Sequence, residues 1–259
     1  TFLTFLLPTA VMSLRRVDRL YRRGLRAHKR RRVGEALRAY RRVLEAEPPL
    51  KPDDVLAATI RANAPILRCA SDEPLPLKDV AAIYSSSRRT IGYHLFYEDD
   101  IDFPNDSEPC DHEVLWVELD EGSRRSTAVC CYYHGRVLRS DESFGSDGRP
   151  EVVVQWGKHG TLPLNWSGDS RLVADMKRTW ERLHTAGARE QDTPLARFWP
   201  DRYTGSWEEF AQPQVRTATE PLVARDGFML IGDRATAILD YCMIPYNFAV
   251  KYAWPDGLY

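Results

Sequence analysis

Residues 113–133 read EVLWVELDEGSRRSTAVCCYY, and this stretch decides the fold. Two runs rich in β-branched and aromatic residues, 113–119 and 126–133, flank the turn-forming residues 120–123, DEGS. Such runs on either side of a short polar turn are typical of antiparallel β-strands. We therefore predict a β-rich core built outward from this pair of strands.

The same pattern continues on both sides of the pair. Residues 90–98 and 151–156 have the composition of further strands, and residues 147–150, DGRP, supply another turn. Short strands joined by turns and irregular loops favour a sandwich or a curled sheet over a βαβ arrangement. Helical spacing returns near residues 170–186 and 234–250. The predicted fold class is α+β, with an antiparallel β-sandwich-like core, an N-terminal helical hairpin and C-terminal helices.

The N-terminal hairpin is predicted from the helical spacing of residues 15–46. Apolar residues recur there at i, i+3 and i+4 in two stripes, as on the buried face of an amphipathic helix. The stripes are Leu14, Val17, Leu20 and Tyr21, and then Ala36, Leu37, Tyr40, Val43 and Leu44. Gly24 and Gly34 bracket a basic hinge between them. Pro48 and Pro49 end the second helix, because proline lacks the amide hydrogen that a helix needs.

These patterns divide the chain into three parts. Residues 1–12 form a tail, residues 13–64 form the hairpin region with a further helix at 52–63, and residues 65–259 form the β-rich main domain. A chain of 259 residues is long enough for a large domain with an appendage. The apolar residues 1–11 are too short to cross a bilayer and lack the basic start of a signal peptide. We therefore expect neither a membrane span nor secretion.

The cysteines indicate a reducing compartment. There are five, an odd number, and they form neither a C-x-x-C motif nor a regular framework. Disulfides are rare in the cytosol, where free cysteines are mostly small buried residues. We expect reduced thiols and a cytoplasmic protein.

Charge is strongly segregated along the chain, although the net charge is only -1. Residues 15–42 contain thirteen Lys or Arg against two acidic residues, whereas residues 95–123 contain eleven Asp or Glu and no Lys or Arg. Segregation of this kind bears on partners and ions rather than on the fold. Because no base-reading motif or stacking aromatic residue accompanies the basic run, we expect a solvated helix face and no nucleic-acid partner.

Three histidines fall at the ends of predicted strands, in or after the acidic segment. They are His112, His134 and His159. If these strand ends meet at one rim of the sheet, three imidazoles and the carboxylate of Glu113 surround one divalent metal ion and leave a position open for water or substrate. The pattern does not distinguish zinc, iron, magnesium or calcium. Taken singly, each histidine is instead typical of a hydrogen-bonded loop residue.

Other side chains near this rim are candidates for catalysis and substrate binding. Carboxylates beside a metal accept imidazole protons or act as general bases, and guanidinium groups and aromatic rings hold anionic or apolar substrates. The candidate catalytic groups are Asp111, Glu113 and Lys158, and the candidate contacts to a small-molecule substrate are Arg149, Trp116 and Trp156.

The order of short motifs in residues 93–163 resembles that of a known family. The aromatic run YHLFY at 93–97 is followed by a His-Glu-x-x-Trp string at 112–116, a His-Gly pair at 134–135 and GKHG at 157–160. In this order the motifs are similar to the β-sandwich family of necrosis-inducing proteins and vacuolar-sorting-associated relatives.

The resemblance implies a β-sandwich with a divalent-cation pocket lined by acidic and histidine side chains. The family motif carries acidic residues at two positions that are occupied here by Leu115 and Val117. The resemblance therefore bears on the fold more than on a reaction.

A second resemblance concerns residues 34–48, which resemble the second half of a tetratricopeptide repeat. We find one such copy, whereas a stable array needs about three. The resemblance implies a partner-binding module at residues 13–48. The alternative is a helical hairpin that simply packs on the main domain.

Three functions follow from these patterns. The first is a metal-dependent enzyme acting on a small molecule, either a hydrolase or a lyase or cyclase of secondary metabolism, with the ion at the histidine rim. The second is a non-catalytic binding or scaffold protein that recruits a partner through residues 13–48. The third, a membrane-associated β-sandwich protein, rests on the family resemblance and ranks last because the sequence lacks a convincing secretion signal and a disulfide framework.

Overall fold

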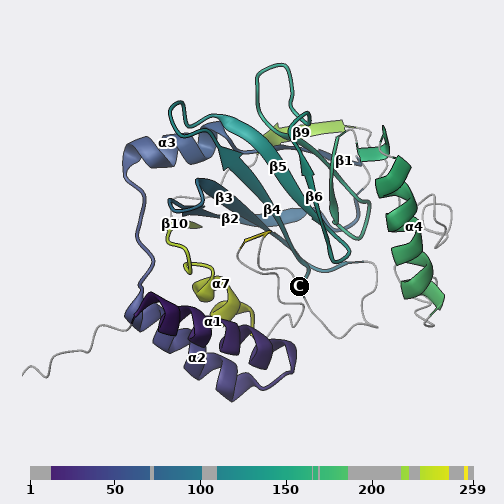
Figure 1. Cartoon of the computed structure of the whole chain (residues 1–259). Coiled ribbons are helices and arrows are strands. Elements are labelled where there is room, and N and C mark those ends of the chain that lie inside the picture. Colours follow the sequence, from purple (N-terminus) through teal and green to yellow (C-terminus); the bar gives the residue numbers. More distant parts are fainter. Residues whose placement is uncertain are drawn as a thin grey trace, which may run out of the picture.

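The computed structural model describes residues 13–70, 73–100, 110–164, 166–168, 170–185, 217–221, 228–244 and 254–255. The described strands form a larger sheet with the order β10-β2-β3-β4-β5-β6 and a smaller sheet with the order β8-β7-β1-β9 (Figure 1). Their bounds are β1 Ile66–Cys69, β2 Leu77–Ser85, β3 Thr90–Tyr97, β4 His112–Leu119, β5 Ser126–Tyr133, β6 Arg136–Ser140, β7 Glu151–Val154, β8 Thr161–Pro163, β9 Thr217–Pro221 and β10 Met229–Ile231. The predicted α+β, sandwich-like fold is confirmed.

The core between the two sheets follows from the alternation of side chains along the central strands. On β4, Leu115, Val117 and Leu119 belong to the core that the two sheets share. Val114 and Trp116 belong to a second core on the opposite face of the larger sheet. Because β4 is paired on both edges and covered on both faces, its middle residues 114–117 are all apolar.

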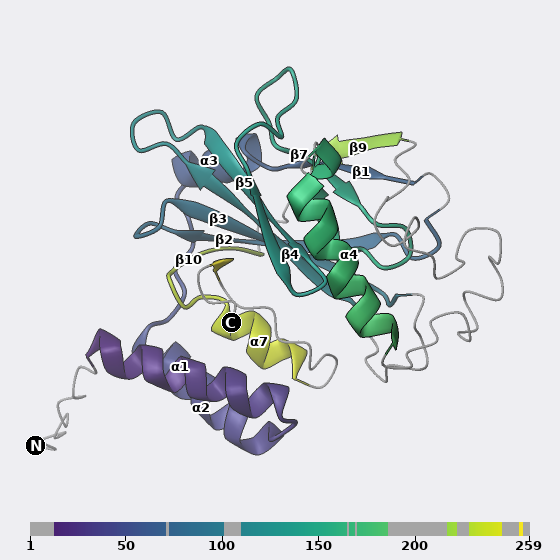
Figure 2. The same ribbon diagram turned by 45° about the vertical axis from the view of Figure 1, so that its right-hand side comes forward.

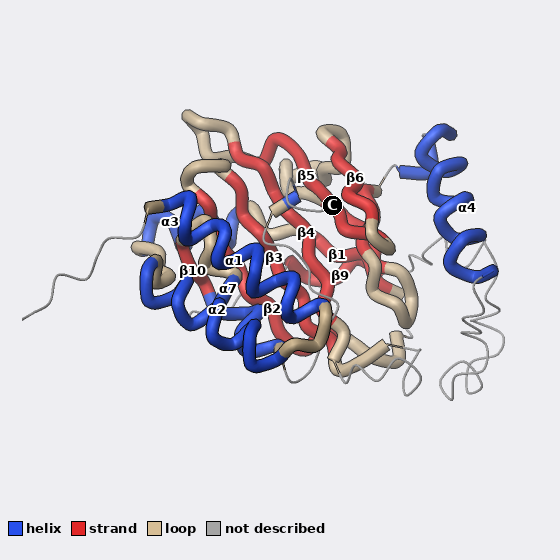
Figure 3. Tube along the Cα trace, turned by 60° about the horizontal axis from the view of Figure 1, so that its bottom comes forward, coloured by secondary structure: helices blue, strands red, loops and turns tan. Residues whose placement is uncertain are grey.

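Helices cover that opposite face. The hairpin of α1 (Leu14–Lys29) and α2 (Val33–Ala46) and the short helix α7 (Ala237–Met243) lie on one side of the larger sheet (Figure 1), and Figure 3 shows them in front of its strands. Their apolar residues form one cluster with Trp116. The Tyr21 hydroxyl also donates to the carboxylate of Asp240 at 2.6 Å and so ties α1 to α7. The predicted helical hairpin is present and packs on the main domain.

Two further helices belong to the sandwich. Helix α3 (Asp54–Ala62) enters the core between the sheets through Ala57 and Ile60, so it packs with the main domain and not with the hairpin region to which the sequence assigned it. Asp53 caps α3 by accepting a hydrogen bond from Leu56 N at 2.8 Å. Helix α4 (Ser170–Thr185) follows the short turn η1 (Trp166–Gly168) beside the strands (Figure 2). Of the helix predicted at 234–250, residues 234–244 are described, and α7 occupies Ala237–Met243 of them.

Two strand pairs are parallel, which the prediction of an antiparallel core did not include. Strand β1 pairs in parallel with β7, and β10 pairs in parallel with β2. Each pair joins segments far apart in the chain, and a long connection allows the second strand to enter in the same direction as the first. Turn signals between neighbouring strands carry no information about such pairs.

Gly24 lets the two helices of the hairpin approach closely. A Cβ at this position would lie 2.7 Å from Cε1 and 2.9 Å from Cδ1 of Tyr40, which is fully buried. We therefore expect Gly24→Ala to lower the free energy of unfolding by about 1–3 kcal/mol through overpacking, although alanine is the better helix former. Urea unfolding followed by circular dichroism measures the change.

Gly34→Ala is the matched control. Gly34 is exposed in the first turn of α2, and the nearest atom to its added Cβ is the flexible end of Arg38, 3.5 Å away. This substitution is expected to be neutral or to stabilise by up to about 1 kcal/mol. Equal effects of the two substitutions would show that the close approach at Gly24 has no energetic role.

Candidate functional site

The densest group of buried charged side chains that we find lies at one rim of the sandwich. Strand β3 ends there at Tyr97, whose backbone N–H donates to the carbonyl of Asp111 at 2.9 Å just before β4 begins. The turn between β7 and β8 brings His159 to the same place. His159 has a left-handed backbone, with φ of 54°, and its N–H donates to the carbonyl of Gln155 at 3.0 Å. This tight turn points the imidazole into the rim.

The imidazole of His159 lies between two carboxylates. Its Nδ1 is 2.8 Å from Asp111 Oδ2, and its Nε2 is 3.2 Å from Glu73 Oε1. The ring is fully buried and stacks on Tyr97, with centroids 3.7 Å apart and an angle of 3° between the planes. The other carboxylate oxygen of Glu73 accepts a hydrogen bond from Gly157 N at 2.9 Å. We call Glu73, Asp111 and His159 the histidine clamp.

The histidine clamp holds a positive charge. Burial alone lowers the pKa of His159, but the hydrogen bonds and negative charges of Asp111 and Glu73 together outweigh burial and raise this pKa to about 9. At neutral pH both ring nitrogens therefore carry hydrogens and donate, one to each carboxylate. An imidazolium has no lone pair for a metal ion, so a metal could bind His159 only after displacing a proton.

A second buried ion pair adjoins the clamp in sequence. Lys158 Nζ is 3.4 Å from Asp100 Oδ2, and both side chains are mostly buried, with 8% and 15% exposed. Glu113 is also buried, on the same face of β4 as Leu115. Burial, followed by nearby acidic groups that include Asp111 and Glu113, raises the pKa of Tyr97 well above its usual range. The rim is thus a crowded cluster of buried charged side chains.

His112 lies on the other face of the larger sheet. It directly precedes Glu113 in β4, and successive strand residues point to opposite faces. His112 Nε2 is 3.0 Å from His94 Nδ1, and its ring stacks on Phe96 with centroids 4.8 Å apart. Burial lowers the pKa of His94 to about 3, so this ring is neutral. Among the described residues, Nε2 of His94 has no hydrogen-bond partner. This favours the tautomer that carries its hydrogen on Nδ1, because an unsatisfied acceptor at Nε2 is then left instead of an unsatisfied donor.

The described contacts place the predicted metal ligands in separate interactions. His134 Nε2 is 2.7 Å from the side-chain oxygen of Gln155, His159 is in the clamp, and His112 and Glu113 face opposite ways. Within the described part of the chain, no group of three or more His, Cys, Asp or Glu side chains is arranged to hold a metal ion. A divalent metal cofactor stays a prediction from the sequence that this geometry does not support.

The other predicted site residues also lie in different parts of the structure. Asp111, Glu113 and Lys158 do gather at the rim. Trp116 is fully buried in the core under the helices, and Trp156 is buried as well, so Trp116 is not placed to touch a substrate. Arg149 lines a separate pocket beside α3. The sequence alone did not show that these residues lie apart, because their positions depend on which sheet, and which face of it, each residue occupies.

Glu73 was missed by sequence reasoning. It lies in the loop between β1 and β2, more than eighty positions before its partners Gly157 and His159. The signal in the sequence was faint: an acidic residue in a proline-containing loop next to a predicted strand. Loops that carry buried charges tend to be functional or structurally essential, which a single sequence does not reveal.

Comparisons with known proteins identify no relative of this chain. No protein-family model matches the chain, and neither the curated proteins nor the solved structures contain a significant match. The resemblances to the necrosis-inducing family and to a tetratricopeptide repeat therefore stay predictions. None of the described helices is both long enough and apolar enough to cross a bilayer.

Proposed function

We propose that this chain is a binding protein whose α1–α2 hairpin docks an acidic segment of a partner protein. The observation that carries the proposal is the exposure of every Lys and Arg in residues 15–42. All thirteen Lys and Arg of residues 15–42 have exposed side chains, while the buried side of the hairpin is apolar. A surface of this charge density attracts anionic partners and speeds their association.

Most of this charge is not neutralised within the hairpin. Asp18 pairs with Arg22 at 3.0 Å, and Glu35 pairs with Arg23 at 2.8 Å. Arg15, Arg19 and Arg26, by contrast, have no ion-pair partner among the described residues. With 3.6 residues per turn, these three arginines share one face of α1 along about 16 Å of helix. A partner segment with regularly spaced carboxylates would match this row.

The side chains on the exposed surface of the hairpin favour carboxylates over nucleic-acid bases or lipid as binding partners. The two tyrosines of the hairpin, Tyr21 and Tyr40, are buried and so offer no surface on which bases could stack. Its exposed large apolar residues are Leu14 and Val33, one at the start of each helix, which is far short of an apolar face for a bilayer. Twelve of the thirteen cations are arginine, whose planar fork binds carboxylates in two-point contacts.

The experiment measures binding of a fluorescent oligoglutamate peptide to the whole chain by anisotropy. Replacing Arg15, Arg19 and Arg26 together by Glu is expected to weaken binding by roughly 10-fold or more, because each exposed pair contributes about 0.5–1 kcal/mol and reversal adds repulsion. Binding to the wild type should also weaken as salt increases, because exposed charges are screened.

The control variant carries the same change of charge at exposed lysines outside the hairpin, with Lys51, Lys78 and Lys177 replaced by Glu. It should bind the peptide nearly as well as the wild type. The proposal would be overturned if the two triple variants lost the same amount of affinity for the peptide. Tighter binding of duplex DNA or of phosphatidylserine vesicles than of the peptide would also overturn it.

A metal-dependent enzyme is a weaker reading of the same molecule. The charges at the rim are consistent with chemistry, since perturbed pKa values gather at functional sites. However, the histidine clamp satisfies both nitrogens of His159, while His112 is hydrogen-bonded to His94 and His134 to Gln155. The basic hairpin is the feature for which packing within the described residues gives no explanation.

A further inference from the structure

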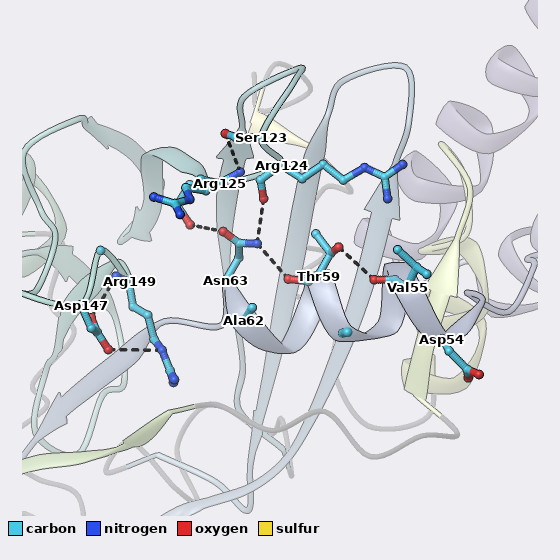
Figure 4. A pocket seen from close by; sticks show the side chains of 13 residues that line it. Asp54, Val55, Thr59, Ala62, Asn63, Ser123, Arg124, Arg125, Asp147 and Arg149 are labelled. Carbon is cyan, nitrogen blue, oxygen red and sulfur yellow. Dashed lines mark hydrogen bonds and ion pairs between the residues drawn. The ribbon is translucent and has the colours of Figure 1, made fainter.

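A pocket beside α3 is separate from both the histidine clamp and the hairpin. It has a volume of about 910 Å³ and lies between α3, the turn that joins β4 to β5, and residues 147–149. Figure 4 shows α3 along its floor, Arg124 and Arg125 above it, and Asp147 and Arg149 at one end. The pocket therefore joins parts of the chain that are distant in sequence.

The wall of the pocket is held in place by Asn63. Its side-chain nitrogen donates to the carbonyls of Thr59 at 2.8 Å and Arg124 at 3.0 Å, and its oxygen accepts from the Ser126 hydroxyl at 2.6 Å. Asn63 is buried, and these bonds tie the β4–β5 turn to the end of α3 (Figure 4). Arg124 has a left-handed backbone with φ of 53°. Such a conformation persists only where the surroundings hold it, so the wall is preorganised.

Two arginines of this wall carry charges that no ion pair within the described residues neutralises. Arg149 Nε is 3.3 Å from Asp147 Oδ2, whereas Arg124 and Arg125 have no ion pair or side-chain hydrogen bond within the described residues. Figure 4 shows the guanidinium of Arg125 pointing toward the end of the pocket that holds Arg149. Asp54, the other acidic residue of the lining, lies at the far end of α3 in that view. Positive charge is thus concentrated at the Arg125–Arg149 end.

The floor of the pocket is partly apolar. Val55, Ala58 and Ala62 form one exposed side of α3 along the floor, and the side chain of Val55 is 68% exposed. Arg124 extends over this side in Figure 4. A flat apolar group between Arg124 and α3 would be covered on both sides, because guanidinium groups stack on aromatic rings.

We propose that this pocket binds a small aryl phosphate monoester, with Arg125 and Arg149 contacting the phosphate and with the aryl group between Arg124 and α3. The phosphate, with up to two negative charges, matches two arginine forks better than a single carboxylate does. Asp147 partly neutralises Arg149 and so sets an upper limit to the affinity. This site does not depend on the proposed function of the hairpin.

The test is isothermal titration of the whole chain with phenyl phosphate, inorganic phosphate and benzoate. Phenyl phosphate is expected to bind with a Kd of about 1 mM or below, tighter than either of the other two. Arg125→Gln should weaken both phosphate ligands by roughly 5-fold or more. Arg124→Asn, which suits the left-handed backbone, should weaken phenyl phosphate and leave inorganic phosphate unchanged. Asp147→Asn should tighten the binding of phenyl phosphate and of inorganic phosphate.

Lys177→Gln, on the exposed side of α4, is the control and should change nothing. Thermal unfolding of every variant distinguishes lost binding from lost structure, because all of these positions are on the surface and their variants should melt like the wild type. The proposal is overturned if phenyl phosphate shows no saturable binding, if benzoate binds as tightly, or if Arg125→Gln binds like the wild type.

Discussion

Replacing His159 by Gln is expected to lower the free energy of unfolding by about 3–5 kcal/mol at pH 7. The imidazolium of His159 is the cation between Glu73 and Asp111, and its side chain is fully buried. Glutamine is neutral, so the buried negative charge of the two carboxylates would lose the positive charge that compensates it. Urea unfolding followed by tryptophan fluorescence measures the loss.

The loss should depend on pH in a defined direction. The pKa of His159 is about 9 in the folded chain, against an ordinary value of 6.5. A raised pKa contributes stability that is fully present below about pH 6.5 and disappears as the pH rises through 9, which here amounts to about 3 kcal/mol. The difference in stability between the wild type and His159→Gln should therefore shrink between pH 6.5 and pH 9.

His134→Gln is the control for this substitution. The side chain of His134 is paired with the neutral amide of Gln155, at 2.7 Å. We expect a loss of about 1 kcal/mol, the value of an ordinary hydrogen bond. A difference between wild type and His159→Gln that stays constant from pH 6 to pH 10 would show that the clamp does not hold a charged imidazole.

The second large effect concerns His94 and acid. Burial lowers the pKa of His94 to about 3, so the folded chain keeps this ring neutral while the unfolded chain protonates it near pH 6.5. The folded state is therefore penalised as the pH falls below 6.5, by about 3 kcal/mol on reaching pH 4. His94→Asn removes this penalty, and the amide nitrogen of Asn takes the place of Nδ1 as a donor toward His112.

The wild-type profile alone would not reveal this effect. Burial, opposed by a hydrogen bond from Tyr21, raises the pKa of Asp240 to about 7, and that shift stabilises the folded chain as the pH falls from 7 toward 3.8. The two effects nearly cancel. The measurement is thus the difference in unfolding free energy between wild type and His94→Asn, followed from pH 7 to pH 4. A difference that does not change by more than about 1 kcal/mol would contradict a neutral, buried His94.

Several elements could be predicted because their cause is local. Strand β5 was predicted with its observed bounds, since residues 126–133 combine β-branched and aromatic side chains after a clear turn. The turn itself is held by Asp120, whose carboxylate accepts hydrogen bonds from the backbone N–H groups of Gly122 and Ser123. Residues within four positions of one another make these contacts, so sequence reading finds them.

The candidate site could not be predicted in the same way. His112 and Glu113 were placed together because both stand at the start of a predicted strand within the acidic segment, but their consecutive positions in β4 send them to opposite faces of the sheet. Strand β2 was not expected, although its pairing with β3 completes the face that buries Tyr97. The pairing is set by contacts across the sheet, which have no counterpart in local composition.

The sequence by itself determined the fold class, the helical hairpin and the strong segregation of charge, because each depends on periodicity and composition within a short window. Tertiary structure alone decided which polar groups meet. Asp111 and His159 are 48 positions apart and Glu73 and His159 are 86 apart. Only the packing of two sheets and the turn after β7 makes them neighbours, since hydrogen bonds act over about 3 Å and take no account of distance along the chain.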